Sequence, residues 1–330
     1  MPPSRGPAVY IGDAGEFRLQ YGSGEAAGVA PAFGRSTHVL VSHQVLRSLV
    51  FTMPSNSNAT LDALQQWFGD CPFAIVAFSG GVDSSVVSFL ANRFLGSERN
   101  LSVISDSPSL KRSELQAAIA FCRRYQIPLE VIATRELDDP RYASNPSNRC
   151  FYCKQTLYRE LQPLASRHNG SWILNGTNVD DLADYRPGLP AADQFQVRSP
   201  LAECRLTKTS VRDLAAALEL ECWNKPASPC LSSRIAYGQP VTEHKLQQIE
   251  EAEAILSQAG FTVVRFRHFG WEGRIEVPAE DLPRLKTVFA ALEPSLRRLG
   301  FDRVIIDEEG FVSGKLNRVL AELNTNLPIL

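Results

Sequence analysis

Between residues 73 and 178, short apolar runs alternate with segments of helical period, and few folds accommodate this order. The apolar runs are residues 73–78, 101–106, 129–134 and 171–178. Runs that are apolar throughout are typical of strands buried on both faces and joined by crossover helices. The alternation therefore predicts an α/β fold with a doubly wound parallel sheet, which binds ligands at the carboxyl ends of its strands.

Three segments of the 330 residues differ in composition. Residues 1–55 are rich in Gly, Ala, Ser and Pro without a sustained apolar period, which predicts a poorly ordered extension. A start codon placed too early is the alternative for residues 1–52. Residues 56–222 hold the alternating pattern, and residues 223–330 combine a long helix near 242–259 with strands and a second helix. This order predicts a smaller α+β C-terminal domain.

Charge and hydropathy narrow the functional class. Lys and Arg number 34 against 36 Asp and Glu, a net charge of −2, so no global basic field holds nucleic acid. No run approaches the roughly 18 apolar residues of a membrane helix, and the first 35 residues lack a signal-peptide core. Seven cysteines are too few for a disulfide scaffold. These features predict a cytoplasmic protein with no membrane partner, and a homo-oligomer is expected because oligomers are common among soluble enzymes.

The most specific motif is Ser79-Gly80-Gly81-Val82-Asp83-Ser84-Ser85, between a predicted strand and a predicted helix. Its two glycines permit a tight turn, and the amides and hydroxyls at the helix start favour an anion. The motif lacks the Lys-Ser/Thr of a Walker sequence. It resembles the PP-loop of the ATP pyrophosphatases, which cleave ATP between its α and β phosphates and adenylate an oxygen of their substrate.

Three further segments carry candidate chemistry. Residues 175–188 (NGTNVDDLADYRPG) place Asp180 and Asp181 after a strand end, where carboxylates could hold Mg²⁺, although an Asx-rich turn is an equal interpretation. Residues 225–235 (KPASPCLSSRI) place Cys230 in a loop with cations. Arg265 and Arg267 alternate onto one face of a predicted strand, a pair suited to a phosphate.

Together these motifs resemble one family, over about residues 58–315. It is the family of ATP-dependent sulfur transferases (LarE) that act on pyridinium-3,5-biscarboxylic acid mononucleotide, in assembly of the nickel-pincer nucleotide cofactor of lactate racemase. The resemblance implies that ATP adenylates a pyridinium carboxylate and that sulfur then displaces AMP, leaving a thiocarboxylate. It implies catalytic roles for Cys230 and Asp83. The implied nucleotide-binding residues are Ser79, Gly80, Gly81, Asp83, Ser84, Ser85, Ser105, Gly176 and Thr177. Arg265, Arg267 and Glu276 would hold the small-molecule mononucleotide substrate.

The resemblance also bears on the sulfur source. In one branch of the family the cysteine matching Cys230 gives up its own sulfur, and in another three cysteines hold a [4Fe–4S] cluster. Cys150 and Cys153, a CxxC pair, together with Cys230 match the cluster branch. Three thiolates leave one iron without a protein ligand. A zinc site that recruits Cys204 or Cys222 and a redox CxxC are the alternatives.

Other functions share parts of this pattern. An RNA-thiolating PP-loop protein would also use adenylation and three cysteines, but the near-neutral charge argues against a nucleic-acid partner. An NAD or GMP synthetase-like ligase would use ammonia and would need no cysteine trio. A non-catalytic nucleotide-binding scaffold would not need the intact SGGVDSS motif.

Overall fold

A computed structural model describes the chain over residues 8–11, 17–20, 55–183, 186–312, 314–315 and 318. Within these residues the main sheet has the strand order β2-β1-β5-β4-β3-β6. Its parallel part consists of β3 (Ala74–Phe78), β4 (Asn100–Asp106), β5 (Leu129–Ala133) and β6 (Trp172–Leu174). Each of these strands begins within one residue of its predicted apolar run, so the predicted parallel sheet is confirmed.

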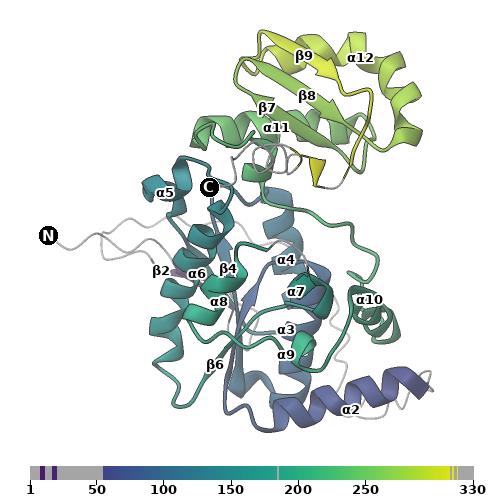
Figure 1. Cartoon of the computed structure of the whole chain (residues 1–330). Helices are drawn as coiled ribbons and strands as arrows, with labels where there is room; N and C mark the ends of the chain where they lie inside the picture. The colour runs from purple at the N-terminus through teal and green to yellow at the C-terminus, as the bar shows by residue number, and fades with distance from the viewer. Residues whose placement is uncertain are drawn as a thin grey trace, which may run out of the picture.

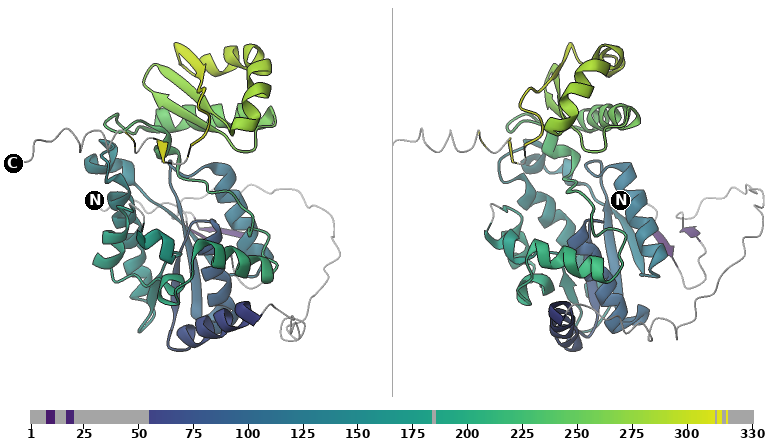
Figure 2. Two further views of the ribbon diagram at one scale, coloured as in Figure 1. Left: turned by 45° about the vertical axis from the view of Figure 1, so that its right-hand side comes forward. Right: turned by 90° about the vertical axis from the view of Figure 1, so that its right-hand side faces the viewer.

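Both faces of the sheet are buried, as β3 illustrates. Its residues Ala74, Val76 and Phe78 belong to one core cluster, whereas Ile75 and Ala77 belong to another. The longer helices of the first cluster are α2 (Ser55–Gly69), α3 (Val82–Leu95), α4 (Arg112–Arg124) and α10 (Lys208–Ala217). The helices of the second are α6 (Arg149–Ala165) and α8 (Leu189–Gln194). Helices on both faces (Figures 1 and 2) confirm the doubly wound architecture and explain why the strands are apolar without alternation.

Two short strands precede the parallel sheet. β1 (Ala8–Ile11) pairs antiparallel with β2 (Phe17–Gln20) and with β5, at one edge of the sheet. Residues 1–55 are predicted to form a poorly ordered extension, and these two strands are regular structure beyond that prediction. The rest of the predicted extension up to residue 54 lies outside the described residues.

The C-terminal part is a smaller layer of helices on a mixed sheet (Figure 1). Strands β7 (Arg265–Phe269), β8 (Glu272–Glu276) and β9 (Arg303–Ile306) form this sheet, antiparallel between β7 and β8 and parallel between β8 and β9. Helices α11 (Glu243–Gln258) and α12 (Leu282–Arg297) contribute to its core. The side chain of Thr242 accepts a hydrogen bond from the Lys245 amide and so caps α11, close to the predicted start of this helix.

The connection between the two sheets holds the remaining short elements. The first part ends with α7 (Val179–Ala183), α9 (Pro200–Glu203) and α10, and the connection then reaches the short helix η3 (Leu231–Arg234). Helix η3 packs against α5 (Pro140–Ala143) and α11 through a buried cluster that includes Tyr142, Leu231 and Leu246. The predicted domain boundary at residue 222 falls in this connection.

Candidate functional site

The SGGVDSS motif forms the turn between β3 and α3. Gly80 has φ +71°, and a Cβ there would lie 3.0 Å from a side chain of α4, so this position requires glycine. The Ser84 hydroxyl donates to the Gly81 carbonyl at 3.1 Å and lies 3.0 Å from the Ser79 hydroxyl. The N-cap residue of α3 is Gly81, which makes no side-chain capping bond. The turn therefore presents a helix N-terminus of the kind that binds phosphate.

A cavity of about 510 Å³ opens at this turn, at the carboxyl ends of the parallel strands. This volume is in the range of small-molecule sites. The predicted site residues that line it are Ser79, Gly81, Asp83, Ser84, Gly176, Thr177, Asp181 and Cys150. The cavity is also lined by three cations that are not among the predicted site residues: Arg149, Lys154 and Arg186. We call it the nucleotide cavity.

The segment after β6 approaches the start of α3 closely. A Cβ on Gly176 would lie 2.6 Å from the backbone nitrogen of Ser84 and 2.9 Å from the carbonyl carbon of Asp83. Two residues on, the Asn178 side-chain amide donates to the Asp83 carboxylate at 2.9 Å. Burial raises the pKa of Asp83, and the hydrogen bond from Asn178 opposes that shift. Gly176 thus allows two strand ends to meet and brings Asp83 to the cavity wall.

Four predicted residues lie away from the cavity lining. Gly80 instead accepts a hydrogen bond at its carbonyl, and Ser85 is buried at 1% exposure beside the Cys222 thiol. The Ser105 hydroxyl bonds to that of Thr134. The Asp180 carboxylate accepts a hydrogen bond from the Lys208 amide at 2.7 Å, at the start of α10. The structure therefore does not bring Ser85, Ser105 or the Asp180 side chain to the nucleotide cavity, because each faces a neighbouring element.

The donor at the Gly80 carbonyl is Lys225, from the KPASPC segment. Its Nζ lies 2.9 Å from this carbonyl oxygen and 2.6 Å from the Glu114 carboxylate on α4. The long connection between the domains is thereby attached to the phosphate-type turn. Lys225 belongs to the KPASPC motif, but the motif by itself indicates no role for this lysine.

Asp181 differs from its neighbour Asp180. Its side chain is 11% exposed, lines the nucleotide cavity, and pairs with Arg186 at 2.6 Å and with Lys208 at 3.1 Å. Asp181 lies close enough to Asp83 for its negative charge to raise the pKa of the Asp83 carboxyl group. Of the two predicted Mg²⁺ ligands, the structure therefore places only Asp181 beside the turn.

A second cavity, of about 240 Å³, lies between the start of α6, the connection and the C-terminal sheet. Its charged lining residues are all cations: Arg149, Arg265, Arg267 and Lys315. We call it the cationic cavity. Arg265 and Arg267 are next-but-one neighbours on β7, as the sequence alternation predicts. The other two cations come from distant parts of the chain, and the sequence analysis did not assign them.

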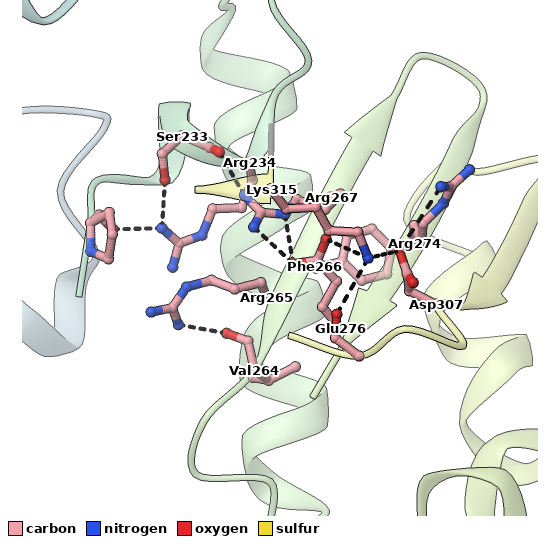
Figure 3. Close-up of polar contacts among 12 residues, drawn as sticks. Ser233, Arg234, Val264, Arg265, Phe266, Arg267, Arg274, Glu276, Asp307 and Lys315 are labelled. Carbon is pink, nitrogen blue, oxygen red and sulfur yellow. Dashed lines mark hydrogen bonds and ion pairs between the residues drawn. The ribbon is translucent and has the colours of Figure 1, made fainter. Parts of the chain in front are cut away.

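Two of these cations have carboxylate partners (Figure 3). Arg267 pairs with Glu276 on β8 at 2.8 Å and donates to the Ser233 carbonyl at 2.8 Å. Lys315 pairs with Asp307 at 2.7 Å. Glu276 is 2% exposed and does not line the cavity. It therefore positions Arg267 and would not itself touch a ligand there.

Arg265 has no such partner among the described residues. Its guanidinium donates to the carbonyls of Val264 at 2.8 Å and Ala227 at 2.7 Å, and it is 7% exposed. Burial and the nearby charge of Arg234 lower the pKa of Arg265 to about 10. A buried cation without a carboxylate gains most from a bound anion, so this cavity is built for a phosphate or carboxylate.

Cys150 and Cys153 lie in the first turns of α6, and Cys230 directly precedes η3. The spacing of three places both α6 thiols on one side of the helix. Burial raises the pKa of Cys150 and of Cys153, and in each case the charge of Cys230 adds to the shift. The fold thus brings the three predicted thiols into one neighbourhood.

Within the described residues, however, no group of three or more His, Cys, Asp or Glu side chains has the spacing of a metal site. The zinc alternative also lacks its extra ligands, since Cys204 and Cys222 pack at the α2 and α3 core instead. Cys71 and Cys122 are buried, which raises their pKa to about 11 and about 12, as expected for packing residues.

Sequence comparisons agree with this geometry. A family model described as NAD synthase matches residues 58–144. The pyridinium-3,5-bisthiocarboxylic acid mononucleotide synthase of Lactiplantibacillus plantarum is 33% identical over 75% of this chain and 90% of its own length. An uncharacterized Synechocystis protein is 42% identical over 79% of this chain and 98% of its own length. A glutamine-hydrolyzing GMP synthase chain of Methanosarcina acetivorans is more distant, 28% identical over 56% of this chain and 64% of its own.

The matches cover both parts of the molecule. The NAD synthase model spans the phosphate-type turn and the first three parallel strands, and the L. plantarum relative extends over most of the chain. In the described part of the chain, no helix has the length and apolar character needed to span a membrane. The chain belongs to the pyridinium-3,5-bisthiocarboxylic acid mononucleotide synthase family of PP-loop proteins and is an ATP-dependent sulfurtransferase.

Proposed function

We propose that this protein adenylates a carboxylate of pyridinium-3,5-biscarboxylic acid mononucleotide and replaces AMP by sulfur, for nickel-pincer nucleotide cofactor assembly. The observation that carries the proposal is that the nucleotide cavity and the cationic cavity adjoin. They share Arg149, Pro229, Ser233 and Tyr237. One cavity suits a triphosphate and the other an anionic group of a second substrate, so the two reactants would meet at the shared wall.

The cationic cavity would take the mononucleotide phosphate. Arg265 lacks a carboxylate partner among the described residues and presents planar donors, while Glu276 holds Arg267 in place from behind. A phosphate dianion bound there would offset the buried charge of Arg265. The sequence motif implies the same role for Arg265 and Arg267, whereas Glu276 would act on the substrate only by positioning Arg267.

The chemistry follows from the poor reactivity of a carboxylate. An oxygen of the substrate carboxylate attacks the α-phosphorus of ATP, and pyrophosphate leaves with the electrons of the broken P–O bond. A sulfur nucleophile then attacks the acyl carbon, and AMP leaves with the C–O electrons. Asp83 and Asp181 would hold the Mg²⁺ that neutralises pyrophosphate, since both line the nucleotide cavity and carry oxygen ligands.

For the sulfur source we propose a [4Fe–4S] cluster on Cys150, Cys153 and Cys230. The three cysteine side chains are suitable ligands for such a cluster, because thiolates are the usual cluster ligands. The three thiols also lie in one neighbourhood beside the nucleotide cavity. Held by these three thiolates, such a cluster would supply the sulfide that the reaction consumes. Cys150 on α6 directly follows Arg149, and Cys230 before η3 directly follows Pro229. Arg149 and Pro229 line both cavities, so these thiols lie near the shared wall.

The test is the iron and acid-labile sulfide content of protein purified without oxygen, followed by product analysis with ATP and the mononucleotide. We expect about four irons per chain, lost in Cys150→Ala, Cys153→Ala and Cys230→Ala and retained in the control Cys204→Ala. We also expect substrate-dependent pyrophosphate release and a thiocarboxylate product. Iron-free protein that makes at most one product per chain, with sulfur lost from Cys230, would contradict the cluster and leave the sulfurtransferase intact.

A further inference from the structure

Arg149 is a charged residue placed where the two cavities join. It is the first residue of α6, it is 4% exposed, and it lines both the nucleotide cavity and the cationic cavity. The next residue, Cys150, lines only the nucleotide cavity. The guanidinium of Arg149 is therefore in reach of ligands on both sides of the shared wall.

One end of this guanidinium is fixed. Its Nη1 donates to the Ser232 carbonyl at 3.0 Å and to the side-chain oxygen of Asn145. A guanidinium has five N–H donors, and these two bonds account for the donors of Nη1 alone. The charge of Arg149 also acts on the neighbouring Cys150 thiol. Within the described residues, Nε and Nη2 have no hydrogen bond to an oxygen or nitrogen atom, so their donors remain for a ligand on a group whose orientation is already set.

Arg149 also lacks the charge partner that comparable arginines have. The buried Arg234 pairs with Glu253 at 2.9 Å, and the buried Arg267 pairs with Glu276 at 2.8 Å. Within the described residues, no carboxylate lies within ion-pair distance of Arg149. A buried cation without a carboxylate partner, between two anion sites, is expected to bind anionic atoms there.

We propose that Arg149 is a catalytic residue of the adenylation step, binding the reacting carboxylate and the α-phosphate of ATP together. The inference rests on the proposed function. As the carboxylate oxygen bonds to the α-phosphorus and pyrophosphate departs, negative charge gathers on the non-bridging α-phosphate oxygens. The planar guanidinium donates to those oxygens and to the carboxylate, so it both orients the attack and stabilises the transition state.

The test measures mononucleotide-dependent pyrophosphate release in Arg149→Met, with ATP affinity measured separately. We expect the rate constant at saturating substrates to fall roughly 10²–10³-fold while ATP affinity stays close to that of the wild type. Arg141→Met is the matched control, because Arg141 pairs with Asp139 and lines neither cavity.

A conservative variant and chemical rescue separate catalysis from folding. Arg149→Lys keeps the charge and should retain part of the activity, and added guanidinium should restore part of it to Arg149→Ala. Unchanged pyrophosphate release in Arg149→Met, or an equal loss in the control Arg141→Met, would overturn the role of Arg149. A wild-type protein that releases no pyrophosphate with the mononucleotide would instead overturn the proposed function, so the two failures are distinguishable.

Discussion

Asp83 shows how one side chain depends on its surroundings. Its carboxylate accepts a hydrogen bond from Asn178 at 2.9 Å and lines the nucleotide cavity, where burial raises its pKa. We expect Asp83→Asn to lower pyrophosphate release roughly 10²-fold or more, because the neutral amide cannot balance Mg²⁺. The fold should persist, since an amide oxygen can still accept from Asn178.

The control for this prediction is Asp180→Asn. Asp180 has the same side chain and was also a predicted Mg²⁺ ligand, but it bonds to the Lys208 amide and lies off the cavity. It should therefore keep most of the activity. Equal rates for wild type and Asp83→Asn, measured with a coupled pyrophosphate assay, would remove Asp83 from the mechanism.

At the scale of elements, the contact between the end of β6 and the start of α3 depends on Gly176. Gly176→Ala would place a Cβ 2.6 Å from the Ser84 nitrogen, which is backbone and cannot rotate away. We expect the segment to shift, the Asn178–Asp83 bond to weaken and ATP affinity to fall about 10-fold or more, at a cost of roughly 1–3 kcal/mol in stability.

Gly69→Ala supplies the matched control, because nothing lies within 4 Å of a Cβ at that position. Calorimetric titration with ATP and thermal unfolding would measure both effects. An alanine at position 176 that binds ATP as tightly as glycine would show that the close approach is not needed for the site.

At the scale of the whole molecule, Glu253 links the two sheets. Its carboxylate on α11 pairs with Arg234 at 2.9 Å, accepts from the Phe266 amide at 3.0 Å and also pairs with Lys111 beside α4. Arg234 in turn donates to the carbonyl of Cys230 at 3.1 Å. Burial would raise the pKa of Glu253, but the charges of Arg234 and Lys111 hold it below its ordinary value.

We therefore expect Glu253→Gln to lower the free energy of unfolding by about 3–5 kcal/mol, because it leaves Arg234 buried and uncompensated. With its pKa depressed in the folded state, Glu253 stabilises the protein above its unfolded-state pKa and loses that contribution as pH falls. Urea unfolding at neutral and acidic pH would measure this. The exposed Glu251→Gln on the same helix should change stability by less than about 0.5 kcal/mol.

The site could be predicted from sequence where its residues follow each other in the chain. The turn Ser79–Ser84 and the pair Arg265 and Arg267 lie where strand and turn patterns place them. Ser105 and Ser85, which the motif also implies in nucleotide binding, do not line the cavity, because a strand end or a helix start does not reveal which way a hydroxyl points. The ion pairs that Asp181 forms with Arg186 and Lys208 also could not be predicted from the local sequence.

Local patterns along the chain were enough to establish the doubly wound sheet, the phosphate-type turn and the family, because periodicity and contiguous motifs involve residues close in sequence. The meeting of Arg149 and Lys315 with Arg265 around one cavity, and the contact of this cavity with the nucleotide cavity, emerged from the folded molecule alone. Residues separated by more than a hundred positions meet through packing of α6, β7 and the connection between the sheets. Such packing depends on the shape of whole elements, which no short pattern records.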